Sequence, residues 1–245
     1  MQIEVNNMKH IAAEMTYPEF AERIKEAKAV LIPVGSCEQH GYHLPLGTDN
    51  SIGEYVATKA AELANCIVMP NVNYGQVWSA KNFPGTISLS DSTLELLLRE
   101  IIIALENNNA KNIILVPGHN GNITVFKSIA RKLLDEFNYT NIWYFNNAFD
   151  KELVSLQESP MYPVFHAGEL ETSMMMAIDT TNVHLDRCQA SYPKAPKTAS
   201  YKPMHWDEYN EIGSFGDASK ASAEKGKQLL DSTIKNLVNL INEYM

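Results

Sequence analysis

Short apolar runs alternate with amphipathic helical patterns over most of the chain, and this alternation limits the fold more than any other feature. The apolar runs have the length of strands and lie at residues 29–34, 66–72, 112–116 and 141–145. Between them, helical spacing predicts helices at residues 49–64, from a cap at Ser90 or Asp91 through Leu105, and at residues 122–138. This order is typical of a parallel sheet covered by helices. We therefore expect an α/β fold with three layers, α/β/α, around a mainly parallel central sheet.

The two ends of the chain add helices to this pattern. Apolar residues at helical spacing follow Thr16, a candidate N-cap, and a longer periodic stretch covers residues 218–245. Residues 191–209 are polar and rich in proline, which predicts a long excursion from the regular elements. No internal repeat or linker interrupts the chain, so we expect a single domain over residues 1–245.

Charge and cysteine content exclude several classes of function. The net charge of −9 argues against a broad basic surface for nucleic acid or for an anionic membrane. No apolar run is long enough to span a bilayer, and the first residues lack the apolar core of a signal peptide. Three cysteines without C-x-x-C spacing fit a reducing compartment. We expect a cytoplasmic protein that acts on a small molecule, without nucleic acid or membrane as a partner.

The loop after the first apolar run concentrates side chains that bind metals. It reads PVGSCEQHGYHLPLGTDN and contains Glu38, His40, His43 and Asp49. Carboxylates together with imidazoles suit Zn²⁺, Mn²⁺ or Fe²⁺. A solvated polar loop is the alternative, because short motifs also arise by chance. Cys37 could instead act as a nucleophile beside a histidine, although a small packed residue is the simpler interpretation.

Two further segments carry the same residue types. His119 follows the apolar run at residues 112–116 directly, and His166, Glu169 and Glu171 lie together in HAGELETS. Proteins with an open parallel sheet bind small molecules at the loops beyond the carboxyl ends of the strands. The loops with Glu38 and His119 are expected at these positions. Taken singly, His119 could cap a helix, and the two glutamates could be acidic residues of a first helical turn. Three such segments in a chain with seven histidines favour a metal site.

Four motifs in order resemble the creatininase (creatinine amidohydrolase) family. They are S-x-E-Q-H-G-x-H-L-P-L-x-T-D, FPGTISL, VPGHNGN and HAGELETS, at residues 36–49, 83–89, 116–122 and 166–173. The resemblance covers residues 30–179 and implies a creatininase-like metallohydrolase with two divalent metal ions per subunit. It also implies a homo-oligomer, with a hexamer suggested by the family. The departures described next place the chain in a branch other than creatininase itself.

The resemblance implies a ligand set. Asp49 would bridge the two ions, with Glu38 and His119 on one and His40 on the other. Creatininase has a metal-binding glutamate where this chain has Gly121. The HAGE form of the last motif in other branches implies that Glu169 supplies the missing ligand.

The same resemblance implies catalytic roles and a reaction. His166 would donate a proton to the departing nitrogen, and Glu171 would orient His166 or a metal ligand. Hydroxide held by the metals would attack the carbonyl of a cyclic or formyl amide in a small polar metabolite. Tyr162-Pro163 replaces the Trp-Asp pair with which creatininase grips its substrate, so creatinine itself is not expected. The alternatives are a 3-dehydro-scyllo-inosose-type hydrolase that cleaves a ring C–C bond, or a non-catalytic metal-binding scaffold.

Overall fold

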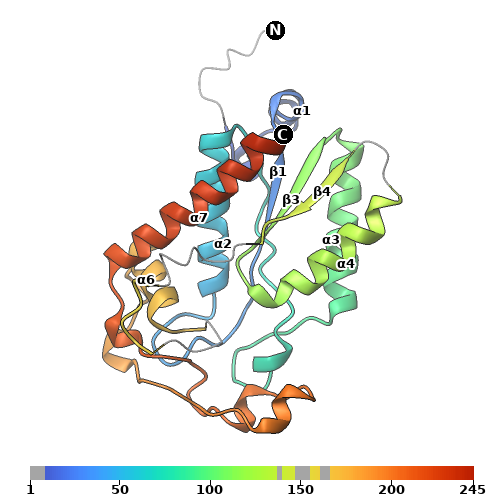
Figure 1. The fold of residues 1–245 in the computed structure, drawn as a ribbon. Helices are drawn as coiled ribbons and strands as arrows, with labels where there is room; N and C mark the ends of the chain where they lie inside the picture. Colours follow the sequence, from blue (N-terminus) through green and yellow to red (C-terminus); the bar gives the residue numbers. More distant parts are fainter. Residues whose placement is uncertain (1–8, 137–139, 147–154, 161–165) are drawn as a thin grey trace.

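A parallel four-stranded sheet forms the centre of the molecule (Figure 1). The computed structural model describes residues 9–136, 140–146, 155–160 and 166–245. The strands lie in the order β2-β1-β3-β4, and every neighbouring pair is parallel. Their bounds are Val30–Val34 for β1, Ile67–Val68 for β2, Asn112–Pro117 for β3 and Asn141–Tyr144 for β4.

Both faces of the sheet are buried because its central strands are apolar at every position that faces a helix layer. Leu31 of β1 and Ile114 of β3 pack into one hydrophobic cluster. Their neighbours Ile32 and Ile113 pack into the other, as the two-residue period of a strand requires. A sheet with two apolar faces needs helices on both sides.

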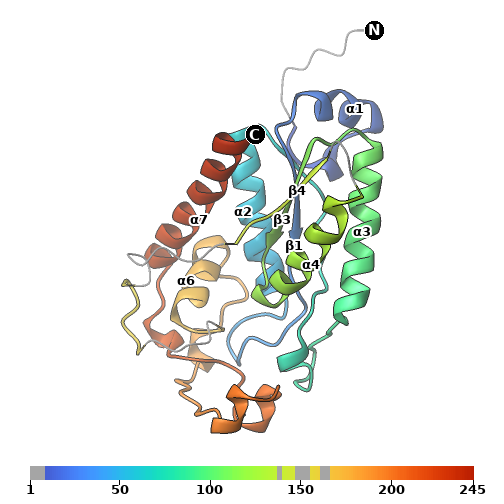
Figure 2. The same cartoon turned by 45° about the vertical axis from the view of Figure 1, so that its right-hand side comes forward.

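Helices cover the sheet on both faces (Figures 1 and 2). One layer contains α2 (Thr48–Ala64), α6 (Glu169–Ile178) and α7 (Ala223–Tyr244). The opposite layer contains α3 (Asp91–Asn107) and α4 (Ile123–Leu134), and α1 (Tyr17–Glu26) adds Ile24 to its core. The expected three-layer α/β/α architecture is therefore confirmed.

Short 3-10 helices occupy several connections. They lie at Ala12–Glu14, Trp78–Ala80, Asn120–Asn122, Leu185–Arg187, Lys197–Ser200, Trp206–Glu208 and Ala218–Lys220. The expected excursion at residues 191–209 contains two of these turns. No helix among the described residues is long and apolar enough to cross a membrane.

Three element boundaries differ from the sequence-based expectation. The run at residues 66–72 forms a strand only at Ile67–Val68, because Pro70 has no N–H for a ladder, although Val72 still bridges Val34. The helix expected at residues 122–138 ends at Leu134. The final helix begins at Ala223, where the Ser222 side chain accepts a hydrogen bond from the backbone N–H of Lys225.

The loops after β1 and β3 pack directly on the beginning of α2. A Cβ atom on Gly118 would lie 2.1 Å from the backbone oxygen of Asp49, so only glycine allows this approach. Asn122 ties the same region together. Its side chain donates to the backbone oxygen of Gly35 and accepts from the backbone N–H of Gln76. The carboxyl ends of the two central strands therefore face the first turn of α2.

Candidate metal centre

Side chains from four separate segments meet beyond the carboxyl ends of β1 and β3. Glu38 and His40 come from the loop after β1, Asp49 from the first turn of α2, and His119 from the loop after β3. Glu171 reaches the same place from the first turn of α6. We call these five residues the cluster. Glu38 and His40 have no exposed surface, and Asp49 retains 2%.

One half of the cluster is formed by Glu38, Asp49 and His119. The Nδ1 atom of His119 lies 3.0 Å from Glu38 Oε2 and 3.0 Å from Asp49 Oδ2. Ser36, buried beside them, donates a hydrogen bond of 2.6 Å to Asp49 Oδ2. Two carboxylates and one imidazole nitrogen therefore converge on one point.

The other half shares Asp49. The Nε2 atom of His40 lies 3.3 Å from Asp49 Oδ1 and 3.6 Å from Glu171 Oε2. Asp49 thus presents Oδ2 to His119 and Oδ1 to His40. Its carboxylate stands between the two groups, which is the arrangement of a bridging ligand.

Backbone carbonyls fix which nitrogen of each imidazole faces the cluster. His40 Nδ1 lies 3.0 Å from the backbone oxygen of Glu38, and His119 Nε2 lies 2.9 Å from that of Gln76. Each of these nitrogens must carry a proton to donate to its carbonyl. The opposite nitrogens, His40 Nε2 and His119 Nδ1, face the carboxylates, where each can hold a proton or, once deprotonated, offer a lone pair to a metal ion. Such outer hydrogen bonds are usual for histidines that bind metals.

The electrostatics of the cluster favour positive charge. Burial opposes protonation of both imidazoles, yet Glu171 and Asp49 raise the pKa of His40 well above its ordinary value. Glu38 and Asp49 do the same to the pKa of His119. Burial acts to raise the pKa of Asp49, but the charges of His40 and His119 hold it well below its usual range. Three buried carboxylates thus attract protons when no other cation is near.

The donor set fits divalent metal ions. Apart from the contacts within the cluster and with His166, no hydrogen bond among the described residues reaches either carboxylate oxygen of Glu38 or the Nε2 atom of His40, although all three atoms are buried. Leaving such atoms unpaired is costly unless a cation binds them. Ligands about 2.0–2.2 Å from one tetrahedral zinc ion lie roughly 3.3–3.6 Å apart. The separations of 3.0–3.6 Å in the cluster are close to that range.

His166 lies beside the cluster and is held by Gln39. Its Nε2 atom is 3.9 Å from Glu38 Oε1, 2.9 Å from the backbone oxygen of Gln39 and 3.0 Å from the Gln39 side-chain nitrogen. A protonated Nε2 can donate to that carbonyl, and a deprotonated Nε2 can accept from that amide. Burial and then the charge of His40 lower the pKa of His166 well below its ordinary value.

Glu169, expected as a ligand, lies elsewhere. Its carboxylate accepts hydrogen bonds from the backbone N–H groups of Glu158 and Ser159 and pairs with Lys225 at 2.7 Å. It belongs to none of the ligand groups found among the described residues. Glu171, two residues farther along the chain, lies beside His40 in the cluster. Its Oε2 atom also accepts a hydrogen bond from the backbone N–H of Ala167.

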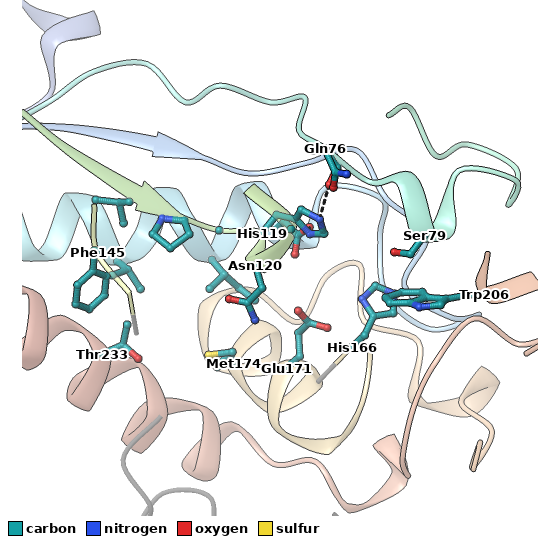
Figure 3. Close-up of a pocket in the computed structure, with 17 residues that line it drawn as sticks. Gln76, Ser79, His119, Asn120, Phe145, His166, Glu171, Met174, Trp206 and Thr233 are labelled. Carbon is teal, nitrogen blue, oxygen red and sulfur yellow. Dashed lines mark hydrogen bonds and ion pairs between the residues drawn. The ribbon is translucent and has the colours of Figure 1, made fainter. Parts of the chain in front are cut away.

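A cavity of about 400 Å³ opens beside the cluster (Figure 3). Asp49, His119, His166 and Glu171 contribute to its wall. Trp206, from the excursion at residues 191–209, lies with its ring 4.8 Å from that of His166. From the sequence, Trp206 is one of several aromatic residues that could form a pocket wall, although such residues more often pack in the core. Ser36 and Gln39 were missed, although both lie within the first motif.

Cys37 and two of the tryptophans do not line the cavity. Cys37 Sγ contacts the backbone oxygen of Gly85 at 3.4 Å and does not line the cavity. Its thiol is therefore not placed to attack a substrate bound there. Trp78 stacks on His205 instead. Trp143 packs against the core beside α7. Tyr162-Pro163, on which the expectation about creatinine partly depends, lies outside the described residues.

Gly121→Ala should weaken metal binding about 10- to 100-fold, because an added Cβ atom disturbs the group that orients His119. That atom would lie 2.3 Å from His119 Nε2 and 2.6 Å from the backbone oxygen of Gln76. Competition with a chromogenic chelator measures the affinity. Gly47→Ala is the matched control, because no atom lies within 4 Å of the Cβ position at Gly47. Wild-type affinity in the Gly121 variant would contradict this role.

His43 should make the metal-free protein sensitive to acid. It is buried, and its Nε2 atom lies 2.9 Å from the Thr172 hydroxyl. Burial and then His40 lower its pKa from 6.5 to about 4, so the unfolded chain binds the proton first. The free energy of unfolding should therefore fall as pH drops from 6.5 to 4, by at most about 3 kcal/mol. Urea titrations between pH 6.5 and 4 should show that the free energy of unfolding falls less in His43→Gln than in the wild type. An equal fall in both proteins would contradict this role of His43.

Comparison with known proteins places the chain among hydrolases. The sequence model of one family, described as "Creatininase: Creatinine amidohydrolase", matches residues 13–241. A creatinine amidohydrolase of Pseudomonas putida is 29% identical over 249 residues, which cover 94% of this chain and 95% of that protein. A mycofactocin precursor peptide peptidase of Mycolicibacterium smegmatis is 30% identical over 223 residues, which cover 88% of this chain and 85% of that protein.

One further relative and two solved structures extend the comparison. A 3-dehydro-scyllo-inosose hydrolase of Thermotoga maritima is 27% identical over 260 residues, covering 94% of this chain and 82% of that protein. A creatininase variant of the Zn–Zn type superposes with a TM-score of 0.84 at 25% identity, over 96% of this chain and 98% of that one. A manganese creatininase gives a TM-score of 0.79 at 25% identity over the same shares. The cluster and these neighbours together support the use of divalent metal.

Proposed function

Because the chain belongs to the creatininase family of hydrolases, we propose that it hydrolyses an amide C–N bond with two divalent metal ions held by the cluster. One observation carries this proposal. Buried ligand atoms of Glu38 and His40 have polar neighbours among the described residues only within the cluster and at His166, and they surround the shared carboxylate of Asp49 at the edge of a cavity. Such a constellation is costly as a packing feature and is what a catalytic metal centre needs.

We assign the ligands from the two halves of the cluster. Glu38 and His119 would hold one ion, His40 and Glu171 the other, and Asp49 would bind both. Mixed carboxylate and imidazole ligands suit zinc, manganese or ferrous iron. When bound, such ions polarise a carbonyl and lower the pKa of a water molecule.

His166 is suited to move the proton that the reaction requires. Hydrolysis of an amide adds the hydroxyl of one water to the carbonyl carbon and a proton to the nitrogen as the C–N bond breaks. Burial and then the charge of His40 lower the pKa of His166, so its imidazole is neutral and can accept a proton before donating it. Gln39 offers Nε2 an acceptor when it is protonated and a donor when it is not.

The names of the relatives support a carbonyl as the site of attack. Two are named as an amidohydrolase and a peptidase, both of which act on C–N bonds. The third is named as a hydrolase of a keto-inositol. C–N cleavage is therefore our first proposal, and ring C–C cleavage of a keto-inositol is the second candidate.

The metal-loaded protein should turn over at least one amide at roughly 1–10³ per second and creatinine far more slowly. The poor turnover of creatinine is expected because Gly121 replaces a ligand of creatininase. A panel of creatinine, formyl amides, N-acyl amides, dipeptides and 3-dehydro-scyllo-inosose tests this, with product formation followed by chromatography. Turnover of the inosose alone would favour the second candidate. Rapid turnover of creatinine would show that the departures from creatininase do not set the substrate.

A further inference from the structure

The cavity beside the cluster has two chemically different ends. In Figure 3, Ser79, His166 and Trp206 lie at one end, and Phe145 and Thr233 lie at the other. We call the second end the apolar limb and define it by Ile52, Val56, Val116, Phe145, Met174 and Thr233. None of these six side chains is charged. All six are buried, with between 1% and 9% of their surface exposed.

Helix α2 shows how the limb continues from the cluster. Asp49, Ile52 and Val56 all line the cavity and follow one another at spacings of three and four residues, so they lie on one face of the helix. Asp49 is in the first turn, and Val56 lies roughly 10 Å farther along the helix axis. The cavity therefore runs from the cluster into the protein between the sheet and the layer of α2, α6 and α7.

The positions of His166 and the limb orient a substrate. His166 lies at the end of the cavity with Ser79 and Trp206, which are half-buried, and the limb lies at the other end, where Phe145 and Thr233 are buried. If His166 protonates the departing nitrogen, the amine part of an amide faces this open end. The acyl part must then point past the cluster into the apolar limb.

We propose that the limb is an acyl-binding subsite, and that the substrates of this protein are amides whose acyl part is an apolar hydrocarbon group. The inference rests on the proposed amide hydrolysis and narrows its substrate class. Products are the apolar carboxylic acid and a polar amine. A formyl group would leave the limb unfilled, and a polyhydroxylated ring would bury hydroxyl groups against hydrocarbon.

Binding of hydroxamates tests the limb without relying on turnover. Acetohydroxamate, butyrohydroxamate, hexanohydroxamate and 3-phenylpropionohydroxamate share one metal-binding group and differ in the apolar part. Calorimetry on the metal-loaded full chain should show affinity rising about three- to fourfold for each added methylene, since each buried CH₂ is worth about 0.8 kcal/mol. Affinity that is flat or falls from acetohydroxamate to hexanohydroxamate would overturn the proposal, as would a failure of all four to bind.

A pair of matched variants separates the limb from general stability. Val56→Leu adds one methylene to the wall of the limb, and Val125→Leu makes the same change in α4, in the opposite hydrophobic cluster. Val56→Leu should weaken the binding of hexanohydroxamate about tenfold and change the affinity for acetohydroxamate by no more than about twofold. The second should change neither. Equal effects of the two variants, or equal loss of long and short ligands in Val56→Leu, would contradict an acyl subsite.

The subsite and the proposed reaction fail in distinguishable ways. Chain-length dependence of hydroxamate binding without hydrolysis of any amide would keep the subsite and reject the reaction. Hydrolysis of N-acyl amides with one common amine at rates independent of acyl size, together with flat hydroxamate affinities, would keep the reaction and reject the subsite. A dependence on the size of the amine instead of the acyl group would reverse the orientation and overturn the proposal.

Discussion

Asp49→Ala should remove both metal ions from each subunit and reduce kcat/KM by at least about 10³-fold, or roughly 4 kcal/mol of transition-state stabilisation. The reason is geometric. Asp49 presents one carboxylate oxygen to the half of the cluster with Glu38 and His119, and the other to the half with His40. Its loss leaves each half short of a ligand. Elemental analysis after reconstitution and dialysis measures the metal content.

Three companion variants make this expectation specific. His40→Ala should spare one ion, because His40 Nε2 faces Asp49 and Glu171 while His119 faces Glu38 and Asp49 in the other half. Ser36→Ala removes only the donor to Asp49 and should weaken binding about 10- to 100-fold. Glu54→Ala changes an exposed acid on the same helix and should keep both ions. Two ions in Asp49→Ala, or none in His40→Ala, would contradict a bridging carboxylate.

Glu171→Gln and Glu169→Gln should have opposite effects, although the residues lie two positions apart. The first should empty the site at His40 and lower the rate on the order of 10²-fold or more, because Glu171 supplies a charged oxygen to the cluster. The second should keep two ions and the wild-type rate. It should instead lower the free energy of unfolding by about 1–2 kcal/mol, because it removes the charge from a buried carboxylate that pairs with half-buried Lys225 and accepts backbone hydrogen bonds.

Metal analysis and urea unfolding of both variants decide between the two glutamates. Lys225→Met serves as a control for the stability effect, since it removes the same pair from the other side. It should destabilise the protein without changing its metal content. If Glu169→Gln loses an ion while Glu171→Gln keeps two, the ligand expected from the sequence is correct and the placement in the structure is wrong.

Much of the fold follows from patterns that are local in the chain. The apolar runs around Leu31 and Ile114 have strand length, and the helices between them have one apolar face. Helix starts were also readable, as at Ser90, whose side chain accepts from the backbone N–H of Thr93. The homo-oligomer, the single domain and the cytoplasmic location remain predictions from the sequence.

The candidate site was readable where it depends on rare motifs. Glu38, His40, Asp49 and His119 follow strands or begin a helix, and parallel strands bring such loops to one edge of the sheet. Ser36 and Gln39 act through contacts with Asp49 and His166, which lie 13 and 127 residues away from them in the chain. Composition or spacing cannot reveal such pairs, because the fold alone brings them together.

By itself, the sequence determined the layers and the parallel order of elements, and it singled out Glu38, His40, Asp49 and His119 as candidate ligands, because each depends on a period or a motif within a short segment. Only the tertiary structure distinguishes Glu169 from Glu171. Both lie in the first turn of α6, where each residue turns the chain by about 100°, so two positions place their side chains on nearly opposite sides of the helix. One side faces Lys225 of α7 and the other faces His40. Which side meets the metal centre depends on how α6 packs, and that is a property of the whole fold.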